Sequence, residues 1–552
     1  MSIRAATLAV FALGVTSISA PFFALPAASD TQPSANARAV DQEQASDSQQ
    51  ARNAAVLEDK ARASFGALSP AELRLVRSAP YRSLAWIGPS SDPDDAANDT
   101  SKAQSWGAER TIREALIRWL LSDAEASKLV HPSGVGIAGA RIAQALDLSY
   151  ITTELPLTIV QCYVSDGLEL GYAHLATVVL RGSRTGAINA DQAVIRGDLA
   201  LSQGRYESVS LFRAEIDGDL DLRAARLVGD APLSAVETKV KGDALFQDGF
   251  QTSGVLDFRL AHIDRSLSFN DAVFTGTREN GLNAERAVID GTLYWVKIGL
   301  GAHTELDLGN ARVGSLWDDR SSWPSPGNLF LVGFVYDDLT GGPSDAASRL
   351  AWLRLQPRSM WTQPQPYRRL ARVLREGGSD AGASEIEIAR EDALARYGDL
   401  GSVERAWKFA LWATIGYGYR PLRALWWILL FVIVGAILFQ WGYRARLIAP
   451  TEPEAYESFN TTGEPPPHYP PFSSFVYSLE NFLPVVDLHQ GAYWRPNPHH
   501  SSALSLSLFG RRAEPTRMPA RLLRWYLWVH ILAGWTITPL LFAGLSGLLR
   551  ND

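Results

Sequence analysis

A seven-residue phrase of alternating apolar and polar positions returns along the middle of the chain. Its order is apolar, any, small, any, leucine, any, apolar, and the clearest copies span residues 195–201 and 216–222. Most copies start 21 to 26 residues apart, with one longer gap of 31 residues before Ile195. Strict alternation of this kind is typical of a strand with one buried face. The copies begin at Ile142, Val164, Ile195, Ile216, Val240, Ile263 and Ile289.

The near-constant period predicts a solenoid, because one coil of this length cannot bury its own inner face and must stack on its neighbours. At this period roughly nine coils fit into residues 135–335, which we interpret as a right-handed parallel β-helix. A Gly-Asp step interrupts several copies where a turn is needed. The alternative is an antiparallel sandwich or barrel, against which the scarcity of Asn-Gly hairpin signals argues. The side chains expected to point inward are Leu199, Leu201, Leu220, Leu222, Leu245, Leu267, Phe269 and Leu293.

Helical periodicity flanks the solenoid region on both sides. Residues 61–134 are expected to form a helical cap, since apolar residues within 108–121 recur at helical intervals. Residues 345–400 are interpreted as a helical hairpin whose first arm is stopped by Gly377 and Gly378. A lone hairpin serves more often as a cap for the last coil than as a peptide-binding site, and we favour the cap.

Two long apolar runs near the end of the chain predict membrane-spanning helices at residues 421–441 and 525–549, so the lipid bilayer is an expected partner. Residues 405–420 before the first span are expected to form an interfacial elbow. Between the spans lies a Pro-rich loop, residues 442–471, followed by a short amphipathic helix at 472–484. This helix is too short to span, so it lies in the interface or re-enters the bilayer.

The N-terminal region and the composition also indicate an envelope protein. Arg4, an apolar run and small residues make residues 1–28 a secretory signal peptide or an uncleaved anchor. Residues 29–60 have no apolar period and are expected to form a flexible tether. A charged fraction of only 20% with 17 Trp suits a chain that meets lipid, and a net charge of −7 argues against a nucleic-acid partner. Cys162 is the only cysteine, which excludes an intrachain disulfide.

Three glycines, Gly134, Gly136 and Gly139, have the G-x-G-x-x-G spacing of a dinucleotide-binding turn. Such a turn needs a strand before it, a helix after it and an acidic residue about 20 positions later. Here the following segment, 140–149, alternates like a strand and matches the lead-in of later coils. We therefore expect the glycines to open the first coil, and we expect no cofactor.

The order of long helix, short helix and long helix over residues 421–549 is also that of a two-helix ion-channel subunit. A pore of this kind requires a symmetric homo-oligomer. The alternative is a plain anchor hairpin with an interfacial helix. The sequence Thr414 to Gly418, TIGYG, resembles a potassium-channel filter, but no spanning helix precedes it and an elbow is the better interpretation. In the pore hypothesis the filter position is taken by Leu483, Pro484, Val485, Val486 and Asp487.

One ionisable residue, His530, lies inside the second predicted span and is a candidate intramembrane polar residue. Arg521 and Arg524 are close in sequence, which favours a position at the interface. No metal site is predicted, because four residues near the loop lack the spacing of a closed site. These are Asp487, His489, His499 and His500.

Several segments together resemble a group of uncharacterised bacterial membrane proteins. They are RTIREALIRWLLSD, HPSGVGIAGARIAQALDLS, QPYRRLARVLREGGSDAGA, GYGYRPLRAL and YSLENFLPVVDLHQGAYWRP. The group is similar in style to pentapeptide-repeat β-helices, and some members are labelled membrane-associated oxidoreductases. The resemblance implies a β-helix joined to a two-helix, ion-channel-like membrane module over about residues 108–550. It implies no catalytic residue in this chain.

The sequence as a whole predicts a mainly β solenoid with an α-helical hairpin and a two-helix membrane module. We expect an interaction scaffold of the bacterial inner membrane whose solenoid is periplasmic and offers its surface to a protein partner. Arginines in the 442–524 loop support that orientation, whereas Arg420 and Arg423 on the other flank weaken it. The alternative is an ion-channel-like pore with the solenoid as regulatory domain. An oxidoreductase is the least favoured hypothesis, and no catalytic residue is identified.

Overall fold

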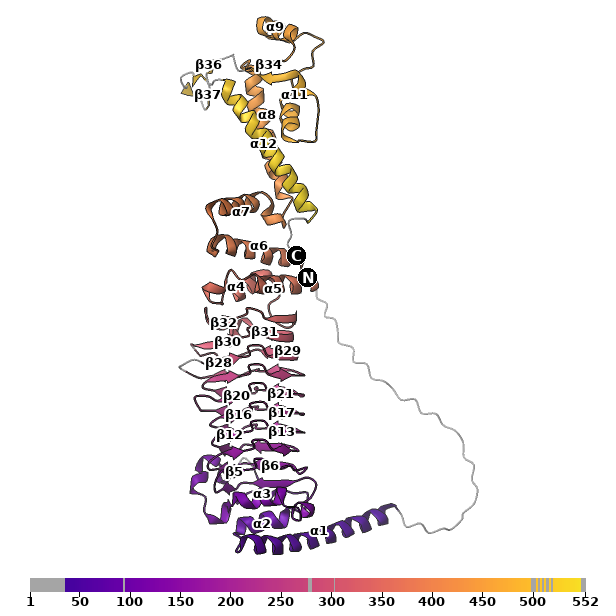
Figure 1. Ribbon diagram of the computed structural model, residues 1–552, viewed down its shortest axis with the longest axis vertical. Coiled ribbons are helices and arrows are strands. Elements are labelled where there is room, and N and C mark those ends of the chain that lie inside the picture. Colours follow the sequence, from indigo (N-terminus) through magenta and orange to yellow (C-terminus); the bar gives the residue numbers. More distant parts are fainter. Residues whose placement is uncertain are drawn as a thin grey trace, which may run out of the picture.

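A computed structural model describes residues 35–92, 95–276, 280–301, 303–497 and 520–547, together with four two-residue strands between 503 and 517. The chain forms a long rod (Figure 1). Helices close one end, a parallel β-solenoid makes the middle, and further helices lead to two long apolar helices at the other end. The predicted signal peptide or anchor, residues 1–28, lies outside the described residues.

The solenoid is right-handed, has about nine turns and presents four faces. This confirms the predicted parallel β-helix and rejects the antiparallel alternative, because every strand pair within it is parallel. The first face contains β1 (Ala85–Trp86), β3 (Val135–Ala138), β6 (Leu157–Val160), β10 (Val178–Arg181), β14 (Leu199–Ala200), β18 (Leu220–Asp221), β22 (Ala244–Leu245), β26 (Leu267–Ser268) and β29 (Val288–Trp295).

The other three faces complete each turn. Face 2 contains β2 (Thr111–Ile112), β4 (Arg141–Ile142), β7 (Tyr163–Val164), β11 (Arg184–Thr185), β15 (Arg205–Tyr206), β19 (Arg226–Leu227), β23 (Gln251–Thr252) and β27 (Val273–Phe274). Face 3 contains β5 (Leu146–Asp147), β8 (Leu168–Glu169), β12 (Ile188–Asn189), β16 (Val209–Ser210), β20 (Leu233–Ser234), β24 (Val255–Asp257), β28 (Asn280–Asn283), β30 (Thr304–Asp307) and β32 (Leu329–Phe330). Face 4 contains β9 (His174–Leu175), β13 (Val194–Ile195), β17 (Glu215–Ile216), β21 (Lys239–Val240), β25 (His262–Ile263), part of β29, β31 (Arg312–Asp318) and β33 (Val335–Leu339).

The apolar side chains of the alternating strands fill the solenoid interior as the sequence predicts, with one exception. Seven of the eight side chains expected to point inward are buried, including Leu199, Leu220 and Phe269. Leu245 is the exception, since Ala244 and Phe246 on either side of it are the buried residues. Successive side chains of a strand point to opposite faces, so a slip of one residue in the register turns Leu245 outward. Ala244 pairs with Leu220 in the coil before it.

The Gly-Asp steps serve a second purpose besides turning the chain. Asp198 Oδ1 accepts a hydrogen bond of 2.9 Å from the backbone N–H of Asp219 in the next coil. Asp219 repeats the contact with Asp243, at 2.8 Å, and Asp243 with Ser266, at 2.9 Å. A Cβ on Gly218 would overlap the Asp198 carboxylate, so the glycine is needed where this ladder passes. The ladder therefore ties each coil to its successor.

One corner of the coil is built from residues in the left-handed region that are not glycine. Tyr172, for example, has a φ of 57°. The cost of this conformation is offset by a backbone hydrogen bond from each corner N–H to a carbonyl of the next coil, 3.0 Å long at Tyr172. The corner residues are Tyr150, Tyr172, Gln192, Arg213, Glu237, Leu260, Arg286 and Asn310.

Cys162 lies in the solenoid core and is fully buried. Burial raises the pKa of its thiol to about 12. Because the thiolate is the reactive form, we expect the folded chain to resist an aromatic disulfide reagent at about pH 8. Labelling should follow unfolding in urea with the same midpoint as the loss of circular dichroism. Rapid labelling of the folded protein, as fast as in denaturant, would contradict this prediction.

The N-terminal cap consists of α1 (Ala35–Phe65), α2 (Pro70–Ser78) and α3 (Glu114–Ser122), with short 3-10 turns at 96–98, 100–105, 108–110 and 127–129. The prediction of a flexible tether at 29–60 is wrong for the described part of that segment. Residues 35–65 form helix α1, and Leu57 and Ala61 are buried. Alanine, which is frequent in this segment, is the strongest helix former. Strands β1 and β2 extend from the cap and pair with β3 and β4 of the first coil.

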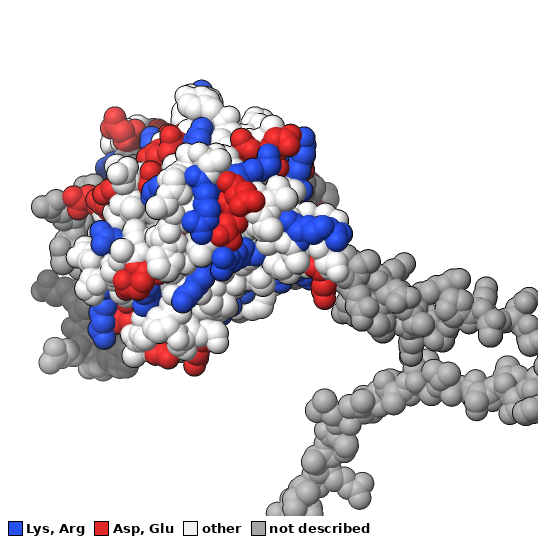
Figure 2. All heavy atoms as spheres, turned by 90° about the horizontal axis from the view of Figure 1, so that it is seen from below, with Lys and Arg blue, Asp and Glu red and all other residues white. Residues whose placement is uncertain are grey.

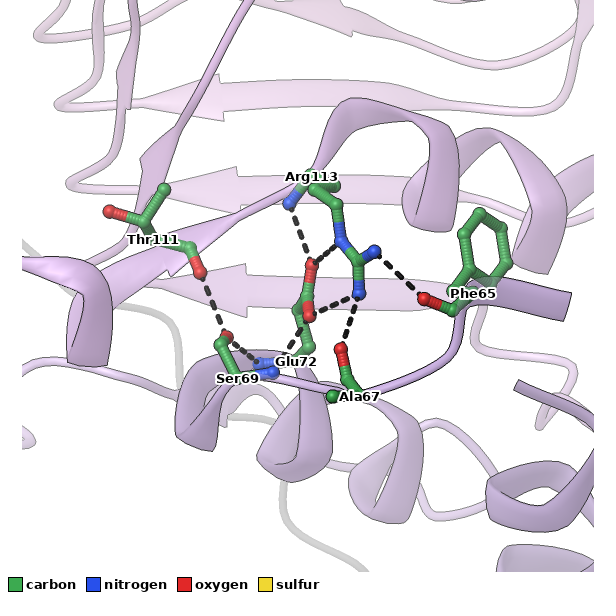
Figure 3. Close-up of polar contacts among 6 residues, drawn as sticks. All are labelled: Phe65, Ala67, Ser69, Glu72, Thr111 and Arg113. Carbon is green, nitrogen blue, oxygen red and sulfur yellow. Dashed lines mark hydrogen bonds and ion pairs between the residues drawn. The ribbon is translucent and has the colours of Figure 1, made fainter. Parts of the chain in front are cut away.

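A charged contact holds the cap together (Figure 3). Glu72 accepts from Arg113 at 2.5 and 2.8 Å, while Arg113 also donates to the carbonyls of Phe65 and Ala67, each at 3.1 Å. Ser69 caps α2 and donates to the carbonyl of Thr111 at 3.1 Å. Burial raises the pKa of Glu72, but the hydrogen bonds from Arg113 and Ser69 outweigh it and keep the pKa below its ordinary value.

A carboxyl whose pKa is lowered in the folded state stabilises the fold above its unfolded pKa of about 4.3, and this contribution is lost as the pH falls. Replacing Glu72 with Gln should therefore lower the free energy of unfolding by about 1.5–3 kcal/mol at neutral pH. It should also flatten the decline of stability below about pH 5. Urea unfolding at several pH values measures both effects. Glu125→Gln, at the exposed ion pair with Lys128, is the control, and equal pH slopes in E72Q and the parent would contradict the prediction.

The far end of the solenoid is covered by helices rather than left open. Helix α4 (Ala346–Leu353) follows β33, and α5 (Pro364–Glu376) and α6 (Asp380–Tyr397) form the hairpin predicted within 345–400. Short 3-10 turns lie at 320–322 and 358–360. The fully buried Arg349 of α4 donates to both oxygens of Asp318 on β31, at 2.8 and 2.7 Å. This ion pair joins the last coils to the helices that lead to the membrane module.

Candidate functional site in the membrane module

Two helices, α8 (Arg423–Arg444) and α12 (Ala520–Leu545), are long and apolar enough to cross a membrane. They correspond to the predicted spans, with α8 beginning two residues later and α12 beginning five residues earlier than expected. Large apolar side chains on both helices face outward, among them Trp426, Ile437 and Leu532. Such surfaces are stable against lipid or against other subunits but not against water.

The predicted short helix at 472–484 is present as α10 (Ser474–Phe482), and it lies against both long helices. Its start is near the end of α8, where the rings of Phe472 and Tyr443 stack at 4.8 Å. Its end is near the middle of α8, where Phe482 and Phe431 lie 5.5 Å apart. Helix α10 therefore runs back along α8 into the middle of the module.

After α10 the chain turns at Pro484 and returns to the end from which it came. Strand β35 (Trp494–Pro496) pairs antiparallel with β34 (Ile448–Pro450), which directly follows α8. The Glu480 carboxylate accepts from the backbone N–H groups of Gln490 and Gly491, at 2.8 and 3.0 Å, and so fixes the returning segment to α10. Residues 474–496 therefore enter the module and leave it at the same end, and we call them the re-entrant hairpin for this path through the protein. The same end of the module carries α9 (Pro453–Thr462), α11 (Gln490–Tyr493), β36 (Ala503–Leu504), β37 (Ser507–Leu508), β38 (Arg511–Arg512) and β39 (Thr516–Arg517).

Polar groups connect the three helices at the level of Ser478. The His530 ring nitrogen Nε2 lies 3.0 Å from the carbonyl oxygen of Ser478, and the Ser478 hydroxyl donates to the carbonyl of Val432 at 2.9 Å. Tyr526 lies 3.4 Å from the other ring nitrogen. An N–H on Nε2 satisfies this geometry, so a neutral His530 fits the contacts. His530 of α12 is therefore connected to α10 by a hydrogen bond to the Ser478 backbone.

His530 is fully buried within the module. It lies next to Gly435, close to the middle of α8, and about 14 Å along α12 from Arg521. A Cβ on Gly435 would overlap the Ser478 hydroxyl, and a Cβ on Gly534 would overlap the Phe482 carbonyl. The two glycines therefore allow α10 to sit between the spanning helices.

The candidate filter residues follow α10 directly. Leu483 packs partly against α12, whereas Val485 is 85% exposed and Asp487 is exposed. Asp487 accepts from the backbone N–H of His489 at 2.9 Å. The structure therefore places Leu483 in the same apolar cluster as Phe482, whose ring lies 5.2 Å from that of His530, and leaves Asp487 exposed. Of the four residues considered as metal ligands, Asp487 and His489 are 3.6 Å apart, and His499 and His500 lie outside the described residues.

The sequence alone missed Ser478 and Glu480, which hold the re-entrant hairpin in place. On the helical repeat the two residues border the apolar positions on opposite sides, and polar residues at the edges of an apolar stripe were the available signal.

The TIGYG stretch is a helix end, in agreement with the elbow interpretation. Helix α7 (Ser402–Ile415) ends at Gly416, which has a φ of 54°, and a 3-10 turn at 416–418 leads toward α8. The predicted elbow at 405–420 therefore consists of a helix of 14 residues and a short turn. Tyr417 donates to Asp392 of α6 at 3.0 Å, and Trp427 of α8 donates to the carbonyl of Ala413 at 3.0 Å.

Charged residues connect this elbow to the hairpin that caps the solenoid. Arg390 pairs with Glu387 at 2.7 Å and with Glu391 at 2.8 Å, and Lys408 of α7 pairs with Glu391 at 2.5 Å. Burial raises the pKa of Glu391, but the contacts with Lys408 and Arg390 outweigh it and lower the pKa overall. Glu391 is therefore ionised at neutral pH and bridges α6 and α7.

The G-x-G-x-x-G glycines lie in the first coil. Gly136 is part of strand β3, and Gly134 has a φ of 85° at the turn that opens this strand. Cβ atoms on Gly134 and Gly139 would overlap Pro156 and Gly88, while the Gly139 carbonyl accepts from Arg110 at 2.7 Å. Strand and neighbouring backbone occupy the space that a pyrophosphate would need, so the glycines serve packing.

The structure also brings together three residues that the sequence did not suggest as a group. His262, Asp264 and Asp290 offer ligand atoms within 4.8 Å of one another on face 4, and all three are exposed. The signal that links them is the register, because Asp264 and Asp290 follow paired residues of successive coils and His262 lies two residues before Asp264. Exposed groups of this kind are common on solenoids with stacked charges, and we assign no metal to them.

Comparison of the chain with protein-family models, with curated proteins and with solved structures gives no match. Fold and site therefore rest on the residues themselves. They define a right-handed β-solenoid, closed by helices at both ends and joined to a module with two helices that could cross a membrane.

Proposed function

We propose that the protein is a membrane-anchored β-helical scaffold of the bacterial envelope. The observation that carries this proposal is the continuity of the rod from the solenoid to α8 and α12 (Figure 1). The buried pair of Asp318 and Arg349 and the bridge from Glu391 to Lys408 join its successive parts. A solenoid fixed to the membrane in this way offers four regular faces to a partner.

The finer parts of the proposal are the inner membrane, a periplasmic solenoid and a cleaved signal peptide. Arg444 at the end of α8, together with Arg446 and Arg495 in the connection to α12, supports a cytoplasmic location of this connection. One turn of the solenoid, from Leu199 to its partner Leu220, takes 21 residues and passes through four faces. Each face therefore contains about five residues, which supports the resemblance to pentapeptide-repeat β-helices.

Site-specific photo-crosslinking in living cells tests the scaffold. A photoreactive residue replaces single outward positions of the solenoid in the full-length chain, such as Val255 or Trp317, with the buried Leu256 as matched control. We expect discrete crosslinks at outward positions of one face and none at Leu256. A membrane-inserted chain without a crosslink at any outward position of the four faces would overturn the scaffold proposal.

A second candidate function is an ion-channel-like pore, and the re-entrant hairpin favours it. Helix α10 enters the module and returns on the same side, so residues 483–487 could line an axis in a symmetric oligomer. Purified oligomer in liposomes should then conduct ions, and Asp487→Asn should change the conductance or its selectivity. Asp248→Asn on the solenoid is the control. A folded oligomer without flux would rule out the pore.

A further inference from the structure

A row of arginines runs along face 2 of the solenoid. Arg184, Arg205 and Arg226 occupy the same outward position in three successive coils, as the parallel register shows. Tyr163 precedes them and Gln251 follows them in the same row. Coils stack at about 4.8 Å, so the row offers one cation for each step of that length. We call Tyr163, Arg184, Arg205, Arg226 and Gln251 the arginine row.

The side chains of the three arginines have no hydrogen bond or ion pair with any residue that the structure describes, whereas their backbone N–H groups bond to the preceding coil. Arg205 and Arg226 are exposed, and Arg184 is half-buried. Like charges directly opposite one another in neighbouring strands destabilise a sheet. An anionic ligand would remove this repulsion.

Face 4 and its corner show that the solenoid elsewhere balances its stacked charges. Lys239 pairs with Glu215 at 2.8 Å, and Lys241 pairs with Asp217 at 2.7 Å, each across one coil. Arg213 pairs with Glu237 at 2.7 Å. The N-terminal end of the rod likewise mixes basic and acidic side chains (Figure 2). The arginine row therefore lacks the pairing with acidic side chains that face 4 and its corner show.

A groove runs beside the row. It has a volume of about 480 Å³ and is lined by Tyr163, Arg184, Arg205, Glu207 and Asp230, among others. Through Val228 and Asp230 it continues into a second groove of about 1070 Å³ further along the solenoid. A linear ligand can therefore lie along the solenoid axis with one side on the arginines.

We propose that this surface binds a linear acidic polysaccharide. The repeated cations match a polymer with one anionic group for each short repeat, and the Tyr163 ring offers an apolar face on which a sugar can pack. Glu207 and Asp230 in the groove can accept hydrogen bonds from sugar hydroxyls, whereas they repel a densely charged polyphosphate or nucleic acid. The proposal rests on the scaffold role above and names its partner.

Binding of the full-length protein in detergent to polygalacturonate tests the proposal. The triple variant R184Q/R205Q/R226Q removes the row, and R213Q/K239Q/K241Q removes the same charge from paired residues of face 4 and its corner. We expect the first variant to weaken binding by at least about tenfold and the second by less than about twofold. Added salt should weaken binding, and neutral dextran should not bind. Unchanged thermal unfolding of both variants ensures that folding is equal.

Three results would overturn the proposal: equal losses in the two variants, no binding to polygalacturonate, or tighter binding to polyphosphate or single-stranded DNA than to the glycan. These outcomes are distinct from failure of the scaffold, which is decided by membrane insertion and crosslinking in cells. Crosslinks to a protein on face 2 that survive loss of the arginines, without glycan binding, would keep the scaffold and reject the polysaccharide.

Discussion

Replacing Asp318 with alanine should lower the free energy of unfolding of the solenoid and its cap by about 3–5 kcal/mol, because it leaves the buried charge of Arg349 without its partner. Asp318 accepts two hydrogen bonds from Arg349 and one of 2.8 Å from the indole of Trp323. Arg349 then retains its 2.6 Å bond to the carbonyl of Pro343 and its contacts with the rings of Trp323 and Trp352.

Urea unfolding of the full-length protein, followed by circular dichroism, measures this loss. Replacing both charges, as in D318L/R349M, should recover most of the stability, because an apolar pair of similar size removes the unpaired charge. The exposed Asp271→Ala, whose pair with Lys297 is 3.9 Å long, should cost less than about 1 kcal/mol. A similar cost for D318A and D271A would show that the junction does not depend on the ion pair.

The second large effect is expected at Gly534. In Gly534→Leu the new side chain would overlap the Phe482 carbonyl. Helix α10 must therefore move out of its position between α8 and α12. We expect a loss of about 1–3 kcal/mol or more, together with exposure of the 483–490 segment. Limited proteolysis of this segment in detergent detects the change.

Thr536→Leu is a matched control for this variant, because Thr536 lies two residues further along α12 and is exposed. It should leave the proteolysis pattern unchanged. A G534L protein as resistant to proteolysis as T536L would contradict the close seat of α10. The same variant also bears on the pore, since flux that survives displacement of α10 could not pass through residues 483–487.

The fold was predictable from the sequence because alternation and period are local properties. Leu220 and Leu222 identify a strand with one buried face, and the return of the phrase identifies the stacking. The prediction that Leu245 points inward was wrong because Ala244 and Phe246 fill the interior instead. Only the register across coils decides which of the neighbouring residues point inward. The α1 helix was missed because alanine-rich segments without an apolar period suit both tether and helix.

The membrane module was less predictable. The periodicity of residues 472–484 shows an amphipathic helix, yet only the pairing of β34 with β35 reveals that the chain returns to the side it left. The burial of His530 depends on three helices that meet at Gly435 and Ser478, and this contact cannot be read from the neighbouring residues in the sequence. The arginine row, by contrast, was visible in principle, because Arg184, Arg205 and Arg226 are spaced by 21 residues each.

Closure of both solenoid ends has a geometric consequence. Helices α2 and α3 lie against the edge strands β1, β2 and β5 at the first coil, and α5 lies against β33 at the last, so helices cover these edges against the addition of another solenoid. The number of coils is thereby fixed by the chain, and about nine coils at about 4.8 Å give a length of about 43 Å. The solenoid is a molecular ruler: removing one complete coil should bring its N-terminal end closer to the spanning helices by about 4.8 Å without changing either end.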